Sequence, residues 1–296
     1  MRIGVLSPLD LQLFRHLTFP VMRRLLHPAE HAPIVAVGAW SEDQPVGLAL
    51  GVMADEQLCE LASFHILPFF RTDMLMSALL DHWETEAAAR GARQAIHFFT
   101  AKPGDDPTAR FFLSRGWSKP GVRTIVCRAT IEVAFATRWL TRAGILPGYR
   151  VIDWASLSGE QRATLRQAGE KPWYPASLDP FHHEEASDAA TSVALLAAEE
   201  GGERLVGWVI THKLDETTLR WTSSFVRPDL QRTGHIVPLW LEVAKRQRDR
   251  TRLTDFIFTV PIEQPRMMRF TARRIKPVLK DHSFGCLTLK ELTDPP

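Results

Sequence analysis

The hydrophobic residues of the chain gather in short runs that polar clusters separate. In the first half, three such runs have the length and apolar content of strands, and residues 41–45 form a polar turn between the first two. A longer stretch, 73–90, carries apolar residues at helical spacing, and Gly91 follows it as a helix stop. The predicted elements are strands at 34–40, 46–53 and 58–67, a helix at 73–90, a strand at 94–100, a short helix at 107–115 and a strand at 122–131.

The second half of the chain repeats this order of elements. Gly144, Pro147 and Gly148 lie close together in residues 141–148, which we interpret as the linker between the halves. The elements predicted beyond it are strands at 149–154, 192–198, 204–212, 218–226, 253–260 and 284–292, and helices at 159–168, 233–247 and 264–274.

Individual residues also recur at a fixed offset of 160 positions. Val46-Gly47 returns as Val206-Gly207, and Pro68 returns as Pro228 in the same register. A single period of this length indicates a duplicated domain and not a solenoid. We therefore expect an α/β protein (α+β, mixed sheet) of two tandem domains, 1–143 and 144–296, each a mostly antiparallel mixed sheet flanked by helices.

Composition narrows the class of protein. The 296 residues are 45% hydrophobic and 24% charged with a net charge of +2, which is typical of globular domains and does not favour nucleic acid as a partner. The three cysteines are far apart and show no metal-ligand spacing, so we expect free thiols and no metal. We find no signal peptide at the start and no apolar stretch of about 18 residues. The expectation is a cytoplasmic protein without a membrane partner, and a homodimer stays open.

The segment 225–236 has the pattern of an anion site. A predicted strand ends, a turn follows, and a helix begins at Gly234. The first amides of a helix have no intrahelical partner, and the helix dipole adds positive potential there. Glycine lets a phosphate approach the backbone closely. An ordinary turn before a packed helix is the alternative explanation.

This segment resembles the signature of the GCN5-related N-acetyltransferase (GNAT) superfamily, [QR]-x-x-G-x-[GA] between a strand and a helix. Gln231, Gly234 and Ile236 occupy its three defining positions, although Ile236 replaces a small residue. The order of elements in both halves also resembles that fold. The resemblance implies that acetyl-CoA or another acyl-CoA is bound by the strand end and by the loop amides. The residues implied are Phe225, Val226, Gln231, Arg232, Thr233, Gly234, His235 and Ile236.

The equivalent turn of the first half departs from that signature. Arg71 fits the first position, but Met74 and Met76 replace both small residues, and Asp73 adds negative charge where a phosphate would lie. We interpret the N-terminal domain as degenerate for CoA binding. The C-terminal domain is the predicted cofactor domain.

The catalytic residues are harder to assign. Many members of the superfamily use a tyrosine on the last helix as the acid, but Phe112 and Phe270 stand at the corresponding positions. Tyr174, one of two tyrosines, is a candidate acid, with a packed aromatic turn as the alternative. Glu60, on a strand where some relatives carry a general base, is a candidate base, with a solvated strand residue as the alternative. His182-His183-Glu184-Glu185 lacks metal-binding spacing, and the basic run 245–252 is typical of a solvated helix end.

The sequence thus predicts an acyl-CoA-dependent N-acyltransferase, with acetyl as the expected group. It would act on an amine of a small molecule that binds near parts of residues 171–186. Two alternatives stay open. One is a non-catalytic tandem GNAT-fold module that binds CoA or a metabolite, which the two phenylalanines favour. The other is a transferase that modifies a protein or an aminoacyl-tRNA, which only the basic run favours.

Overall fold

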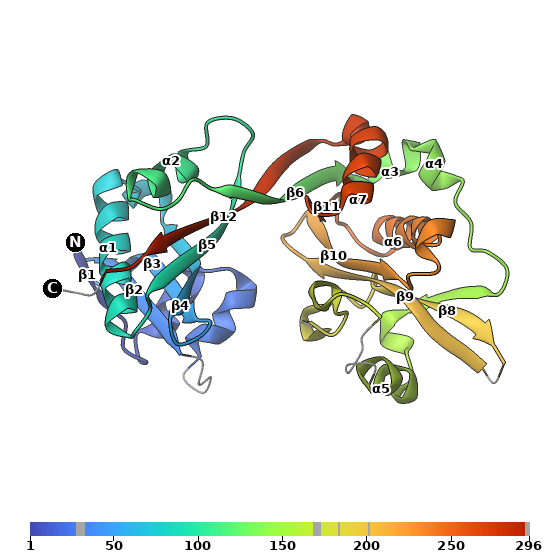
Figure 1. Cartoon of the computed structure of the whole chain (residues 1–296), viewed down its shortest axis with the longest axis horizontal. Helices are drawn as coiled ribbons and strands as arrows, with labels where there is room; N and C mark the ends of the chain where they lie inside the picture. Colours follow the sequence, from blue (N-terminus) through green and yellow to red (C-terminus); the bar gives the residue numbers. More distant parts are fainter. Residues whose placement is uncertain (28–32, 168–172, 183, 201, 294–296) are drawn as a thin grey trace. The chain divides into compact units, whose positions relative to one another are not determined.

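The computed structural model describes residues 1–27, 33–167, 173–182, 184–200 and 202–293. The chain divides into two compact units (Figure 1). Unit 1 comprises Met1–Arg123 together with Phe284–Pro296, and unit 2 comprises Thr124–Ser283. The expected boundary at 143/144 therefore falls inside unit 2, and the last strand of the chain belongs to unit 1.

Unit 1 is built on six strands in the order β1-β2-β3-β4-β5-β12. All neighbours pair antiparallel except β4 and β5, which are parallel. Helix α1 begins after Thr72, whose Oγ1 accepts from the Leu75 amide at 3.2 Å. The elements are β1 (Arg2–Val5), η1 (Leu11–Leu17), η2 (Pro20–Leu26), β2 (Ile34–Ser41), β3 (Gln44–Met53), β4 (Leu58–Ile66), η3 (Pro68–Phe70), α1 (Asp73–Ala89), β5 (Gln94–Ala101), α2 (Pro107–Ser114) and β12 (Asp281–Glu291).

Unit 2 has six strands in the corresponding order, β7-β8-β9-β10-β11-β6. Here β10 and β11 are the parallel pair. The strands are β6 (Gly121–Thr130), β7 (Tyr149–Asp153), β8 (Val193–Glu199), β9 (Gly202–Lys213), β10 (Thr218–Val226) and β11 (Asp255–Pro261). The helices are α3 (Ile131–Ala136), α4 (Arg138–Thr141), η4 (Trp154–Ser156), α5 (Gly159–Gln167), η6 (Ala176–Leu178), η7 (Glu184–Ala186), η8 (Gln231–Thr233), α6 (Ile236–Arg250), α7 (Pro265–Phe270), the π-helical turn η9 (Thr271–Ile275) and η10 (Lys276–Val278).

The strand next to β5 in unit 1 and the strand next to β11 in unit 2 each come from the other half of the sequence. β6 follows α2 in the chain, yet it pairs with β11 from Thr124↔Pro261 to Thr130↔Asp255. β12 follows η10, yet it pairs with β5 from Phe284↔Ala101 to Glu291↔Gln94. Residues 122–131 and 284–292 are strands as predicted, but not in the domains to which the sequence order assigned them. An alternating pattern specifies a strand and its buried face, not the strand with which it pairs.

Contacts of β12 explain why it belongs to unit 1. Lys290 Nζ donates to Glu84 Oε2 at 2.6 Å and to the carbonyl of Arg115 at 2.9 Å. Leu292, just beyond the strand, is buried in the same hydrophobic cluster as Trp83 and Phe112. These contacts and the β5 ladder give β12 its place in the sheet.

Each unit buries both faces of its sheet. In unit 1, one face packs against α1, and the other against η1 and η2 through residues such as Phe14 and Leu17. In unit 2, α3, α4 and α6 cover one face, while the segment from η4 to η7 covers the other. Mixed sheets with covered faces need strands that are apolar on both sides, which is why β2, β3 and β8 read as nearly continuous hydrophobic runs.

Several expectations concern features of the whole chain. All three cysteines are free and buried. Within the described residues, no group of three or more His, Cys, Asp or Glu side chains is arranged to hold a metal, and no helix is long and apolar enough to cross a bilayer.

Candidate cofactor site

The parallel strands β10 and β11 separate half-way along their length. They are paired from Thr218↔Asp255 only as far as Trp221↔Phe258. Beyond that point β10 continues to Val226 beside β9, and β11 continues to Pro261 beside β6. A break in a parallel ladder leaves backbone groups on both facing edges without a strand partner, and such groups need other hydrogen-bonding partners.

A β-bulge accompanies this separation. The register between β10 and β9 shifts between Trp221 and Ser223, so Thr222 is the extra residue. In unit 1 the β4–β3 register shifts in the same way between Leu61 and Ser63, and β4 and β5 are paired only from Leu58↔Gln94 to Glu60↔Ile96. The two bulges lie at the 160-residue offset found in the sequence, so the offset reflects repeated geometry.

The turn after β10 ends at a glycine in a left-handed conformation. Gly234 has φ +78°, which side-chain-bearing residues rarely adopt. A Cβ built on Gly234 would meet no atom within 4 Å, so open space lies beside the backbone at this point. The expected helix start at Thr233 is therefore wrong: residues 231–233 form a 3-10 turn, and α6 begins at Ile236. Pro238 consequently stands in the first turn of α6, where its missing N–H costs no helical hydrogen bond.

The N-terminus of α6 is uncapped. No side chain caps the helix, so the amides of its first turn are left for another acceptor. Neighbouring amides at an uncapped helix start form a nest for an anion, which the helix dipole reinforces. This geometry fits a pyrophosphate.

Hydrogen bonds within the turn hold the nest in shape. Gln231 Nε2 donates to the carbonyl of Val226 at 3.1 Å, and the Thr233 hydroxyl donates to the carbonyl of Leu230 at 2.8 Å. His235 Nδ1 lies 2.6 Å from the Thr233 hydroxyl oxygen. Because that hydroxyl already donates to Leu230, Nδ1 must carry the proton and donate to it. The nest is thus organised by its own side chains.

The other predicted cofactor residues divide into two groups. The side chains of Phe225 and Val226 are buried, so only their backbone on the β11 side is left for a ligand. Arg232 and Ile236 lie in the turn and at the first position of α6. Arg232 is exposed and makes no ion pair with a described residue, so it contributes positive charge beside the nest.

The corresponding turn of unit 1 is organised differently. Thr72 caps α1 with its own side chain, and its amide donates to the carbonyl of Phe70 at 3.0 Å. Asp73 follows immediately. Where β4 and β5 separate, Phe64 packs against Phe111 and Phe112 with ring centroids 5.9 Å away in both cases. In unit 1, a side-chain cap therefore occupies the helix start and aromatic rings occupy the strand separation, and both of these places are open in unit 2.

The candidate catalytic residues lie in different units. Tyr174 is in unit 2, packed edge-to-face on Trp208 at 5.0 Å and next to Trp173, which contacts Phe225 at the end of β10. Burial, and secondarily Asp179, raises the pKa of the Tyr174 phenol, which therefore keeps its proton. Glu60 lies on β4 of unit 1, where burial raises the pKa of its carboxyl. Residues 171, 172 and 183 of the expected acceptor region lie outside the described part of the chain.

The sequence analysis missed Arg220. It is the counterpart of Glu60 at the 160-residue offset, so the position of the expected base carries a guanidinium in unit 2. Arg220 is exposed at the surface of the strand, but desolvation by neighbouring groups lowers the pKa of its guanidinium, and no carboxylate of the described residues pairs with it. His212, opposite it in the β9–β10 ladder, lies with Nδ1 2.7 Å from the hydroxyl of Thr222. Applying the repeat offset to Glu60 would have revealed this polar group.

Phe270, which stands at the tyrosine position of the resembled pattern, is part of an aromatic cluster in unit 2. Its ring packs edge-to-face on Trp139 at 5.3 Å and lies 6.0 Å from Trp240. Trp240 in turn donates its indole N–H to the Ser224 hydroxyl at 2.6 Å, on the part of β10 that has left β11. An aromatic wall therefore stands beside the separated strands, and none of its members is an acid.

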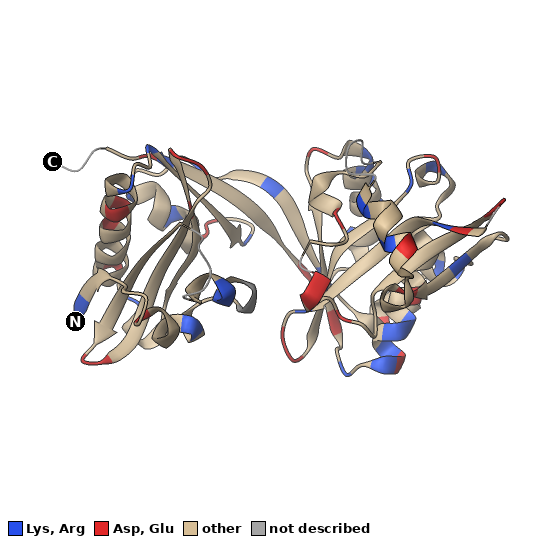
Figure 2. Ribbon diagram, turned by 90° about the horizontal axis from the view of Figure 1, so that it is seen from below, with Lys and Arg blue, Asp and Glu red and all other residues tan. Residues whose placement is uncertain are grey.

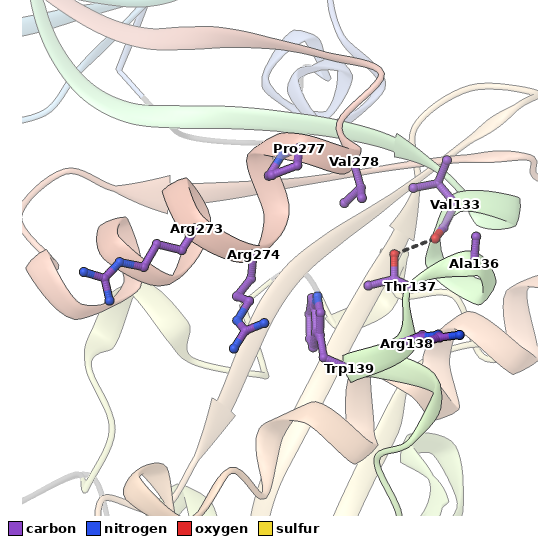
Figure 3. Close-up of a pocket in the computed structure, with 9 residues that line it drawn as sticks. All are labelled: Val133, Ala136, Thr137, Arg138, Trp139, Arg273, Arg274, Pro277 and Val278. Carbon is purple, nitrogen blue, oxygen red and sulfur yellow. Dashed lines mark hydrogen bonds between the residues drawn. The ribbon is translucent and has the colours of Figure 1, made fainter.

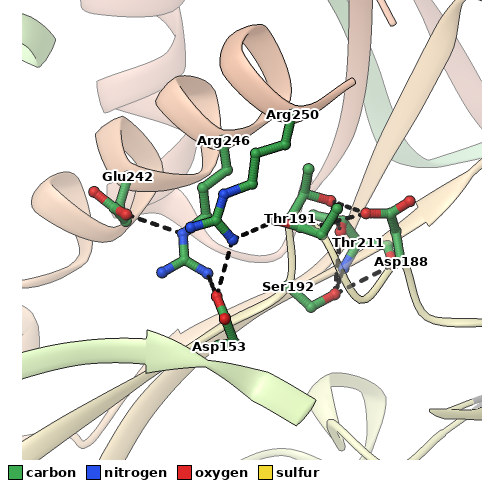
Figure 4. A network of polar contacts seen from close by, with 9 residues as sticks. Asp153, Asp188, Thr191, Ser192, Thr211, Glu242, Arg246 and Arg250 are labelled. Carbon is green, nitrogen blue, oxygen red and sulfur yellow. Dashed lines mark hydrogen bonds and ion pairs between the residues drawn. The ribbon is translucent and has the colours of Figure 1, made fainter. Parts of the chain in front are cut away.

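The basic run at the end of α6 is largely engaged in ion pairs. Arg246, only 7% exposed, pairs with Asp153 and Glu242, and Arg250 pairs with Asp153 at 3.1 Å (Figure 4). The same corner holds a cluster of buried hydroxyls around Thr211. Arg248 pairs with its neighbour Asp249 and covers the Phe135 ring. The ion pairs of this run with Asp153 therefore join α6 to β7.

Over each unit as a whole, positive and negative segments are interspersed (Figure 2).

Comparisons with known proteins agree with this geometry. Residues 8–117 match the family model described as the acetyltransferase (GNAT) family. A tandem GNAT protein from the clavulanic acid biosynthesis pathway superposes with a TM-score of 0.73 at 14% identity, covering 100% of this chain and 99% of that one. The chain is a tandem GNAT-fold protein. None of the curated proteins matches it by sequence.

Two further solved structures have a similar fold. A GCN5-related N-acetyltransferase from Sphaerobacter thermophilus has a TM-score of 0.57 at 17% identity, covering 99% of this chain and 97% of that one. A glucosamine N-acetyltransferase region of a fungal multi-domain β-N-acetylglucosaminidase has a TM-score of 0.55 at 14% identity, covering 97% of this chain and 38% of that one. At these identities the likeness is one of fold. The sequence match lies in unit 1, whereas the open nest lies in unit 2.

Proposed function

We propose that the chain transfers an acyl group, with acetyl as the first candidate, from CoA to an amine of a small molecule, and that unit 2 holds the cofactor. The observation that carries this proposal is the uncapped start of α6. There, the uncapped amides of the first helical turn follow a left-handed Gly234 with open space beside it, after β10 has parted from β11.

The cofactor would be held mainly by backbone groups. The amides of Gly234, His235 and Ile236 suit the pyrophosphate, and the free edge of β10 near Phe225 suits the amide groups of the pantetheine arm. The thioester supplies an activated carbonyl and a thiolate leaving group. Such binding by backbone tolerates Ile236, since the branched side chain leaves its amide in place.

The acceptor would lie on the opposite face of the β10 end, where Trp173 and Tyr174 pack next to Phe225. A small-molecule amine is supported by the glucosamine N-acetyltransferase region among the structural neighbours. Phe270 has no proton to give, so catalysis would depend chiefly on holding amine and thioester together. That effect alone can account for about 7–11 kcal/mol of the barrier. The amine would lose its proton to water or to a side chain that acts as a general base.

Thermal melting with and without acetyl-CoA tests the cofactor assignment. A ligand that binds only the folded protein stabilises it by about 2.7 kcal/mol at 100 times its Kd. We expect a higher melting temperature of unit 2 at millimolar acetyl-CoA. An unchanged melting temperature would remove the basis of the proposal.

A non-catalytic CoA-binding module is the second candidate, because phenylalanine stands at both tyrosine positions and Phe112 is fully buried. A panel of amines with acetyl-CoA, followed by mass spectrometry of the products, separates the two. If CoA stabilises the protein and no amine in the panel is acylated, the binding module replaces the transferase.

A further inference from the structure

A surface cavity of about 520 Å³ lies in unit 2 between the α3–α4 segment and the segment that follows α7. Its lining combines apolar and cationic side chains, and none of its members is acidic. The residues are Val133, Ala136, Thr137, Arg138, Trp139, Arg273, Arg274, Pro277 and Val278 (Figure 3). Cavities of this volume suit small organic ligands.

Trp139 offers both a ring and a hydrogen-bond donor to this cavity. Phe270 packs edge-to-face on one side of it at 5.3 Å and fixes its orientation. Several other indole N–H groups have protein acceptors, as Trp83 does at Val35 and Trp240 at Ser224. The Trp139 indole N–H donates to no acceptor among the described residues, and it is therefore available to a ligand.

Arg274 extends into the same space from the opposite side. Figure 3 shows its guanidinium directed toward Trp139, whereas Arg273 and Arg138 point away from the ring. Arg274 makes no ion pair or hydrogen bond with a described residue. A planar guanidinium that faces an aromatic ring across an open gap is suited to hold a flat molecule between them and to pair with its negative group.

The backbone that carries Arg274 is itself unusual. Residues 271–275 form a π-helical turn, and such turns are rare and occur frequently at functional sites. Lys276 follows, so the local charge is positive without a neighbouring acid in the cavity. A bound anion would neutralise it.

We propose that this cavity binds a small planar organic anion, with its ring on Trp139 and its carboxylate or phosphate on Arg274. The lining of this cavity shares no residue with the nest at Gly234. The inference does not depend on acyl transfer, since it concerns binding alone.

Titration calorimetry with 2-naphthoate and its neutral analogue 2-naphthamide tests the site in the full chain. We expect naphthoate to bind and naphthamide to bind at least 10-fold more weakly. Arg274→Gln should weaken naphthoate at least 10-fold, and Trp139→Leu should do the same. Arg269→Gln is the matched control, because it removes a cation from α7 outside the cavity and should change affinity less than 2-fold.

Three results would overturn the proposal. One is the absence of naphthoate binding at 1 mM. Another is equal loss in Arg274→Gln and Arg269→Gln, which would indicate a general charge effect. The last concerns the source of the anion: if adenosine 3′,5′-bisphosphate displaces naphthoate and Arg274→Gln weakens CoA by the same factor, the cavity is part of the cofactor site. Circular dichroism of each variant checks that it is folded.

Discussion

Gly207 lies directly opposite Val226 in the β9–β10 ladder, so close that a Cβ on Gly207 would sit 2.7 Å from Val226 Cγ1 and 2.8 Å from the carbonyl oxygen of Phe225. Phe225 and Val226 are the last two residues of β10, the strand that leads into the nest. Glycine at position 207 thereby sets where β10 ends and where the turn to α6 begins.

Gly207→Ala should therefore displace the end of β10. Overpacking of this kind costs about 1–3 kcal/mol, and the shifted turn should weaken acetyl-CoA. The matched control is Gly47→Ala, where the added Cβ would meet only side-chain atoms at 3.1–3.3 Å. Urea unfolding and CoA titration of both variants check this, and equal CoA affinity in the two would contradict it.

Gly234→Glu tests which unit holds the cofactor. It places a side chain at a left-handed residue and adds negative charge to the nest, so CoA binding should be lost. Met74→Glu makes the corresponding charge change in unit 1, where Met74 is 82% exposed and Asp73 already precedes it. That variant should bind CoA as the parent does. Loss in Met74→Glu alone would move the cofactor to unit 1.

Tyr174→Phe tests the mechanism. If positioning dominates, kcat should fall less than 10-fold, and the rate should rise with pH as more of the acceptor amine loses its proton. Because the pKa of Tyr174 is raised above its usual value of 10, its ionisation should cause no decline of the rate across neutral pH. Tyr149→Phe, which keeps the ring that packs on His235 at 4.4 Å, is the control for the only other phenol. A 100-fold loss of kcat in Tyr174→Phe with unchanged CoA affinity would identify a phenol acid.

Asp255 should make the stability of unit 2 depend on pH. Burial alone would raise its pKa, but hydrogen bonds from Lys280 at 3.0 Å and Arg128 at 2.9 Å outweigh burial and hold the pKa below its usual value. A lowered carboxyl pKa in the fold means stability that is complete above the unfolded pKa of about 3.9 and is lost as pH falls through the folded pKa.

The variant Asp255→Asn should accordingly lose about 2 kcal/mol of unfolding free energy at pH 7, since hydrogen bonds to a charged group are removed. The difference from the parent should shrink below pH 4. Asp249→Asn removes an exposed carboxylate paired only with its neighbour, and it should change stability little at any pH. Urea titrations at pH 7, 5 and 3 give the comparison, and a constant difference across that range would show that charge is not the cause.

The sequence predicted the elements better than their partners. Periodicity placed α1 and the paired hairpins correctly within a few residues, because burial on one or two faces leaves a pattern in the chain. It placed the start of α6 three residues early, since a left-handed glycine interrupts a segment whose composition is helical. The exchange of β6 and β12 left no pattern, because alternation specifies a strand and its buried face but not its partner. Helices α3 and α4 were not predicted, since no element was assigned between the strand expected to end at 131 and the linker expected from 141.

The candidate site was predicted in part. The glycine and its turn follow a local pattern that a sequence displays directly. Arg220 and Trp139 do not, because their importance comes from neighbours on other elements, at the β9 ladder and beside Phe270. The cofactor roles of residues 225–236 and the catalytic roles of Tyr174 and Glu60 stay predictions that the variants above address.

The strand exchange also fixes the order in which the protein can be completed during its synthesis. The six described strands of the unit 2 sheet lie before residue 262, whereas the unit 1 sheet needs β12, which follows all of them in the chain. Ribosomes add about 5–20 residues per second, and N-terminal domains usually fold first. In this protein, unit 1 emerges first, but the edge of β5 stays unpaired for many seconds until β12 is made. Unit 2 emerges second, yet its sheet can be completed before that of unit 1.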